Sequence, residues 1–143
     1  MNRPNACTLF GLYLGLIVAS ILDQGKSIVA ADPDTRVFEM RIYFAAEGKL
    51  ESLNTRFRDH TTKLFEKHGI SNIGYWEPID NKERQLIYFL AYPTREAREQ
   101  SWKAFSADPD WQKAKNASEV NGKLVAKVES KFFQATDYSP AIK

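Results

Sequence analysis

The chain has very little cysteine and no marked excess of charge of either sign. Its 143 residues include one cysteine, Cys7, so no disulfide can form within a single chain. Lysine and arginine number 20 against 18 aspartates and glutamates, which lacks the clustered basic excess typical of nucleic-acid-binding proteins. A hydrophobic core must therefore stabilise the fold, and we expect no nucleic-acid partner.

Histidine is also scarce, which argues against a metal or haem centre. The chain contains only His60 and His68. No second histidine lies within one helical turn of His60, so the spacing of metal-ligating pairs on a helix is absent. We expect neither a metal nor a cofactor.

An uncharged stretch over residues 4–22 follows Arg3 near the start of the sequence. Its apolar centre has the length of the hydrophobic region of a secretory signal peptide rather than that of a membrane span. The small residues Val29-Ala30-Ala31 fit a signal peptidase site. The sequence thus predicts a signal peptide over residues 1–31, cleaved before Asp32.

Cleavage would leave a mature domain over residues 32–143 that is free of thiols, secreted or periplasmic, and without a stable membrane anchor. The alternative is an uncleaved anchor or a buried helix. It stays open because residues 23–28 make a longer spacer than signal peptides usually have.

Hydrophobic periodicity predicts six elements in the mature domain. Leu50, Leu53, Phe57 and Leu64 follow the three-and-four spacing of a helix that runs to His68, with Gly69 as its stop. Thr94 caps a second helical region, which restarts at Asp108-Pro109 and ends at Asn121-Gly122. Alternation and short apolar runs predict strands over 37–44, 70–76, 86–92 and 124–133.

The order strand, helix, strand, strand, helix, strand predicts an α+β, ferredoxin-like βαββαβ fold with a four-stranded antiparallel sheet. Right-handed crossovers place both helices on one side of that sheet. The strand Leu86 to Tyr92 is apolar on both of its faces, so the side without helices also needs a cover. A second copy of the chain is the most economical cover, and we expect a homodimer.

Several short motifs occur in order over residues 37–140. They are Phe38-Glu39-Met40-Arg41-Ile42-Tyr43, Gly48-Lys49-Leu50, Phe57-Arg58-Asp59-His60-Thr61, Phe65-Glu66-Lys67-His68-Gly69, Asn72-Ile73-Gly74-Tyr75-Trp76, Phe105-x-x-Asp108-Pro109-Asp110-Trp111 and Tyr138-Ser139-Pro140. Taken together, these motifs resemble the NIPSNAP family. The resemblance implies a dimeric α/β barrel, in agreement with the two-faced strand, and it implies no established reaction. The wider superfamily includes cofactor-free monooxygenases and isomerases, so fold analogy leaves the activity open.

His60 is the candidate catalytic base. It falls between Phe57 and Leu64 on the helix stripe, so its imidazole is expected to face the sheet, where partial burial suits proton transfer near neutral pH. The alternative is a core histidine that hydrogen-bonds a strand or a tyrosine hydroxyl.

Three polar residues, Glu39, Arg41 and Tyr43, share one side of the first strand. They are candidate ligand-binding residues, with Arg41 recognising a carboxylate or enolate and Tyr43 donating a hydrogen bond. Alternatively, Glu39 and Arg41 form an ion pair across the dimer interface. Trp76 and Tyr92, at strand ends, are the aromatic candidates for a pocket mouth.

Two hypotheses follow. In the first, a homodimeric binding or accessory domain holds a small apolar or aromatic ligand between sheet and helices. In the second, a cofactor-independent monooxygenase-like or isomerase-like enzyme uses His60 as a general base, with Arg41 and Tyr43 stabilising an oxyanion. The second requires His60, Arg41 and Tyr43 to meet at one cavity.

Overall fold

The computed structural model describes residues 34–142, so the predicted signal peptide lies outside the described residues. Within that range no helix is long and apolar enough to cross a membrane. The elements, in chain order, are β1 (Val37–Ala45), α1 (Leu50–Arg56), the π-helical turn η1 (Phe57–Thr61), α2 (Thr62–Lys67), β2 (Ser71–Trp76), β3 (Gln85–Tyr92), α3 (Arg95–Ala107), α4 (Pro109–Ser118) and β4 (Val125–Gln134).

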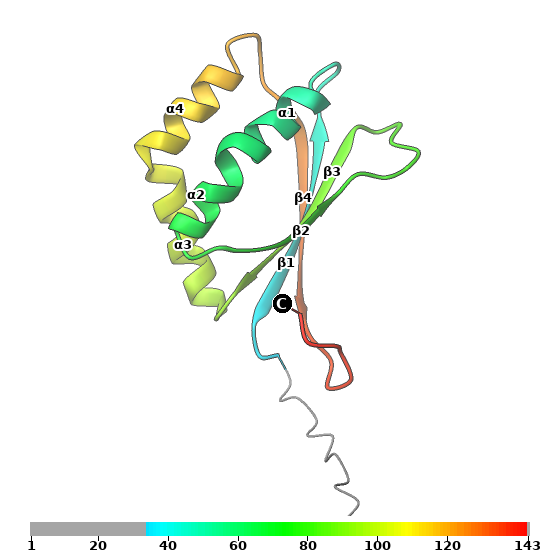
Figure 1. Ribbon diagram of the computed structural model, residues 1–143, viewed down its shortest axis with the longest axis vertical. Helices are drawn as coiled ribbons and strands as arrows, with labels where there is room; N and C mark the ends of the chain where they lie inside the picture. Colours follow the sequence, from blue (N-terminus) through cyan, green and yellow to red (C-terminus); the bar gives the residue numbers. More distant parts are fainter. Residues whose placement is uncertain (1–33, 143) are drawn as a thin grey trace, which may run out of the picture. The chain divides into compact units, whose positions relative to one another are not determined.

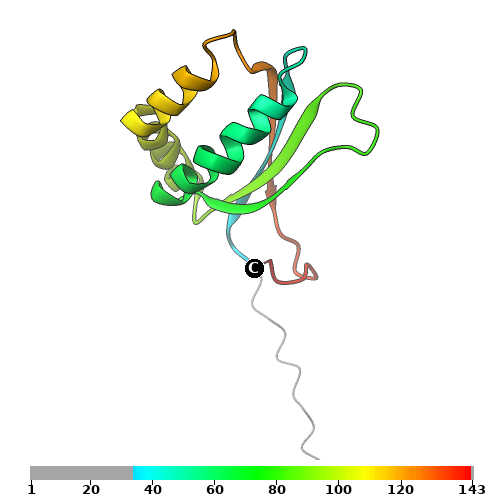
Figure 2. The same ribbon diagram turned by 45° about the horizontal axis from the view of Figure 1, so that its top comes forward.

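The four strands form one antiparallel sheet in the order β2-β3-β1-β4, which confirms the predicted α+β, ferredoxin-like arrangement. Ile42 on β1 is paired with Ile87 on β3, and Arg41 is paired with Ser130 on β4. All helices lie on the same side of the sheet (Figures 1 and 2). The sheet therefore has one covered face and one face without helices.

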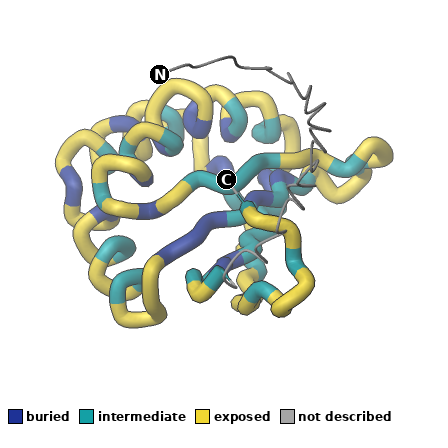
Figure 3. Tube along the Cα trace, turned by 60° about the horizontal axis from the view of Figure 1, so that its bottom comes forward, coloured by how far each residue is buried: buried dark blue, intermediate teal, exposed yellow. Residues whose placement is uncertain are grey.

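The covered face carries the hydrophobic core. Every second residue of β3 points toward the helices, and Tyr88, Leu90 and Tyr92 are completely buried there. The buried strand residues lie on β1 and β3, and buried positions occur at intervals along the helices (Figure 3). The other core residues are Ala45, Leu53, Phe57, Phe65, Ile70, Leu86, Phe105 and Leu124.

The opposite face of the sheet, called the bare face below, has no helix over it. Its residues alternate with those of the core along each strand. Trp76 and Phe133 remain 53% and 43% exposed on it. The edge strand β4 contributes charges to the same face. The apolar residues of the bare face are Phe38, Met40, Ile42, Phe44, Ile73, Trp76, Ile87, Phe89, Ala91 and Phe133, and the charged ones are Lys127, Glu129 and Lys131.

The helix ends lie close to the predicted caps. The Thr94 hydroxyl accepts a hydrogen bond from the Ala97 N–H at 3.1 Å, and the Asp108 carboxylate accepts one from the Asp110 N–H at 2.8 Å. Gly69 has a φ of +72°, the left-handed conformation that ends a helix. The last helix ends at Ser118, a turn before the predicted stop at Asn121-Gly122.

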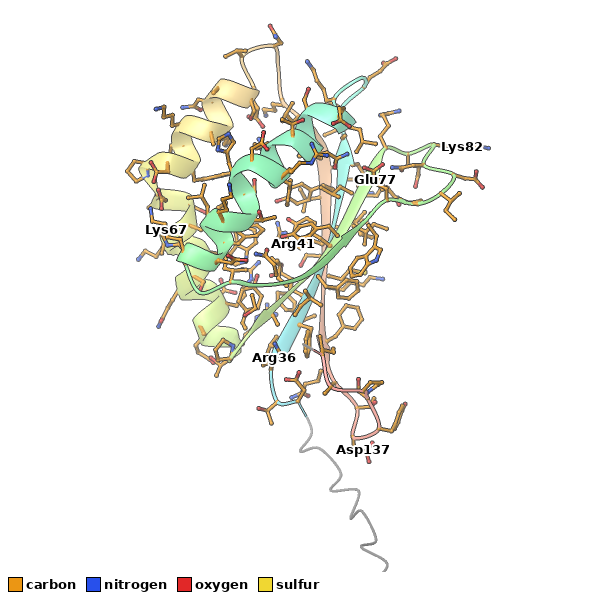
Figure 4. All side chains as sticks on the ribbon, viewed as in Figure 1. Arg36, Arg41, Lys67, Glu77, Lys82 and Asp137 are labelled. Atoms are coloured by element: carbon orange, nitrogen blue, oxygen red, sulfur yellow. The ribbon has the colours of Figure 1, made fainter. Side chains whose placement is uncertain are left out.

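The segment after β4 returns to the start of β1 (Figure 4, Arg36 and Asp137). Arg36 donates a hydrogen bond to the carbonyl oxygen of Ile142 at 2.8 Å and forms an ion pair with Asp34 at 2.6 Å. Phe38 is only 4% exposed and borders a small groove together with Ile142. The chain itself thus covers one end of the bare face.

Candidate functional site

Glu39, Arg41 and Tyr43 lie on the covered face of the sheet, on one side of β1 as predicted (Figure 4 labels Arg41). Glu39 is completely buried. Its carboxylate accepts hydrogen bonds from Arg41 Nη1 at 2.6 Å, Arg98 Nη2 at 2.9 Å, Ser130 Oγ at 2.8 Å and the Tyr92 hydroxyl at 3.0 Å. The two arginines offset the charge of the buried carboxylate.

These contacts decide the ionisation of Glu39. Burial alone would raise the pKa of this carboxyl, but the hydrogen bonds from Arg98, Ser130 and Arg41 and the charge of Arg41 lower its pKa from 4.5 to about 2. Glu39 is therefore an anion throughout the physiological pH range and is too weak a base to serve as a general base near neutral pH.

Arg41 is likewise held in place by several groups. Its Nε donates to the Tyr88 hydroxyl at 3.1 Å, and its guanidinium lies 4.3 Å from the centre of the Trp102 ring. Trp102 Nε1 in turn donates to the Tyr92 hydroxyl at 2.7 Å. Glu39 and Arg41 thus pair within one chain, on the face of the sheet that α3 covers.

Tyr92 and Trp76 do not lie together at a pocket mouth. Tyr92 is completely buried, and burial raises the pKa of its hydroxyl well above the usual value. The ring of Trp76 is on the other side of the sheet, 5.8 Å from the ring of Phe89 and folded over Gly74. The predicted site residues are therefore divided between the two faces. Tyr92 shares the covered face with the polar residues of β1, whereas Trp76 is opposite Ile87 on the bare face.

His60 is exposed and does not face the sheet, so its predicted orientation is wrong. The π-helical turn explains the difference, because the Thr62 N–H bonds to the carbonyl of Phe57, five residues back, and one extra residue enters the turn. Positions 60 and 64 were predicted to face the core, but the residues buried there are Thr61 and Phe65, each 1% exposed.

The observed position of His60 separates it from Arg41 and Tyr43, with which it was expected to act. It lines an outer cleft between α1 and α4 together with Thr55, Ala114 and Ser118. Arg41 lies in the ion network under α3, so His60 and Arg41 do not meet as proton transfer would require.

A cleft that the sequence did not predict lies where α1 and η1 meet the end of β2. It has a volume of about 480 Å³ and is called the aromatic cleft below. Phe57 and Leu86, 5% and 4% exposed, and the half-buried Tyr75 contribute its apolar surface. The lining residues are Asn54, Phe57, Arg58, Thr62, Tyr75, Trp76, Glu77 and Leu86.

Residues of the helices and residues of the strands together form the walls of the aromatic cleft. The Phe57 ring meets the Tyr75 ring edge-on at 5.6 Å, and Tyr75 stacks on Tyr88 at 5.4 Å. At the rim, Asn54 Nδ2 donates to Glu77 Oε1 at 2.5 Å, which links α1 to the residue after β2. Of the predicted site residues, only Trp76 borders this cleft, and its ring points to the bare face.

The architecture defines the fold class, and comparison with solved structures agrees. A NIPSNAP domain protein from Burkholderia xenovorans is 21% identical, with a TM-score of 0.63 over 73% of this chain and 99% of its own. A NIPSNAP family protein from Agrobacterium tumefaciens is 23% identical, with a TM-score of 0.65 over 73% and 97%. SnoaB, a cofactor-independent oxygenase from Streptomyces nogalater, is 15% identical, with a TM-score of 0.55 over 76% and 100%.

These structures share the α+β, ferredoxin-like fold with this chain, and at such identities they show the fold alone. The sequence matches no curated protein. The NIPSNAP family model matches residues 38–140, and the chain belongs to the NIPSNAP family.

Proposed function

We propose that this NIPSNAP-family chain is a secreted or periplasmic homodimer that binds a small apolar or aromatic molecule in the aromatic cleft. The observation that carries the proposal is the cleft itself, a space of about 480 Å³ with an aromatic and aliphatic floor. The separation of His60 from Arg41 favours binding over proton transfer. Export is supported by the signal-like sequence of residues 1–31.

The cleft has the size and lining of a small-molecule site. Ligand pockets are typically about 300–1,000 Å³, mostly apolar, with a few polar groups that orient the ligand. Here Phe57, Tyr75 and Leu86 offer apolar contacts, while Asn54 and Glu77 supply an amide and a carboxylate at the rim. A neutral aromatic ring fits the edge-on and stacked arrangement of the wall.

Homodimerisation is supported by the bare face. A four-stranded sheet with strands about 4.8 Å apart and up to about 30 Å long offers roughly 500 Å² on one face. Two such faces amount to roughly 1,000 Å², which is about the smallest area expected of a biological interface. A two-fold dimer would place Ile42 and Phe89 of each copy against the other sheet and remove the exposed Trp76 from water.

Binding is tested with 2-naphthol, a neutral aromatic probe, by equilibrium dialysis. Thr62 borders the cleft, so Thr62→Trp fills it and should weaken binding at least tenfold. Thr55→Trp places the same ring on the exposed side of α1 and should leave the affinity unchanged. If 2-naphthol does not bind saturably, or if both variants bind equally, the assignment of the cleft is wrong.

The assembly is tested by native mass spectrometry and sedimentation. We expect a dimer for the protein and a folded monomer for Ile42→Asp, since a carboxylate at the centre of the bare face cannot be buried against another sheet. Val120→Asp, at a 77% exposed position between α4 and β4, should remain dimeric. Circular dichroism confirms that the variants are folded, and a monomeric parent protein would contradict the proposal.

A further inference from the structure

A second cavity lies between α4 and the start of β4, away from the aromatic cleft. Its volume is about 360 Å³. Tyr43 contributes from β1, Trp111 from α4, Lys123 from the connection after α4, and Val125 from the first position of β4. The connection from α4 to β4 lies at the top of the ribbon in Figure 2. The remaining lining residues are Arg56, Lys115, Glu119, Ala126, Lys127 and Val128, so this basic cavity shares no residue with the aromatic cleft.

Arg56 is the buried charge of the basic cavity. It is 4% exposed, and its Nη1 donates to Glu119 Oε1 at 3.0 Å and to Ser118 Oγ at 3.3 Å. Its guanidinium lies 5.2 Å from the centre of the Trp111 ring. The buried Nε–H has no hydrogen-bond partner among residues 34–142. Buried donors without an acceptor are rare in folded proteins, so the Nε–H points to a missing acceptor.

The charges around Arg56 define what that acceptor must be. Lys115 and Lys123 are exposed at the cavity, and neither forms an ion pair within the described part of the chain. Lys127 is paired with Glu129 at 2.6 Å. Glu119 is the single carboxylate in the lining and is already shared with Arg56. Positive charge is therefore in excess, which favours an anion.

The apolar lining of the basic cavity indicates that the ligand also has an apolar part. Tyr43 and Trp111 present aromatic rings from opposite layers, and Val125 and Val128 are aliphatic. Guanidinium and ammonium groups bind carboxylates through charge-assisted hydrogen bonds, and aromatic rings bind planar apolar groups. We propose that the basic cavity binds a small aromatic carboxylate, with its carboxylate at Arg56 and Lys123 and its ring against Tyr43 and Trp111.

Benzoate and its neutral isostere benzamide test the proposal by calorimetric titration of the full chain at low ionic strength. Benzoate should bind at least tenfold more tightly than benzamide. Lys123→Gln is exposed and should leave folding intact while weakening benzoate binding at least threefold. Lys103→Gln, at an exposed position of α3 outside the cavity, is the matched control and should bind benzoate normally.

A second measurement observes Arg56 directly. Benzoate at saturation should shift the Arg56 Nε–H resonance in a ¹⁵N-resolved spectrum, and benzamide should not. The proposal is overturned if benzoate does not bind, if benzamide binds equally well, if Lys123→Gln is without effect, or if the Arg56 resonance stays in place. Thr62→Trp should leave benzoate binding unchanged, so the outcome here is independent of the aromatic cleft.

Discussion

Removing the negative charge of Glu39 should change how the stability of the protein depends on pH. The carboxyl has a pKa of about 2 in the folded state and 4.5 as its ordinary value. Because the folded-state pKa is the lower one, the stabilisation is complete above pH 4.5 and is lost as the pH falls toward 2. A difference of this size corresponds to about 3 kcal/mol in the free energy of unfolding at neutral pH.

Glu39→Gln keeps the size of the side chain and removes its charge. It leaves the largely buried Arg41 without a counter-ion and leaves Arg98 with only the exposed Glu99, so we expect a loss of about 3 kcal/mol at pH 7, which shrinks to about 1 kcal/mol at pH 3. Urea unfolding followed by circular dichroism at a fixed protein concentration gives both values.

Glu99→Gln is the control for this experiment. Glu99 also pairs with Arg98, at 3.2 Å, but its side chain is 60% exposed. Its loss should cost less than about 0.5 kcal/mol at either pH. If Glu39→Gln and the parent protein lose stability in parallel between pH 7 and pH 3, the ion network does not have the strength that its geometry implies.

Two further substitutions test the helices. Thr94→Ala removes the acceptor for the Ala97 N–H and should lower the free energy of unfolding by about 1 kcal/mol in urea titrations, with Thr94→Ser restoring most of it. An unchanged midpoint for Thr94→Ala would mean that α3 does not depend on this cap. His60→Ala should change the free energy of unfolding by less than about 0.5 kcal/mol, because the ring is exposed. A loss above 2 kcal/mol would show that His60 is packed after all.

The sequence predicted the fold because each element carried its own local signal. Alternation in β1, the Thr94 and Asp108 caps and the stop at Gly69 all depend on neighbouring residues only. The apolar pattern of Leu86 to Tyr92 also correctly indicated a strand with two apolar faces. Local signals of this kind were sufficient to order strands and helices into the βαββαβ arrangement.

The site was less predictable because it depends on the relation between elements. A π-helical turn has no residue signature in this sequence, and its one extra residue exchanged His60 for Thr61 at the buried position. Arg98 and Ser130 complete the shell of Glu39, yet they lie 59 and 91 residues away in the sequence. The residues around Arg98 on α3 and around Ser130 on β4 give no sequence signal that links either of them to Glu39. The aromatic cleft likewise forms where α1 meets β2.

The charges on β4 bear on what keeps this edge of the sheet from joining the edge of another chain. An edge strand with free N–H and C=O groups can recruit another edge, and repeated recruitment leads to ribbons. Lys127, Glu129 and Lys131 sit on the face of β4 that would have to flatten against a growing stack. Replacing all three residues with valine would make this edge strand apolar on that face, and we expect such a variant to aggregate by strand pairing.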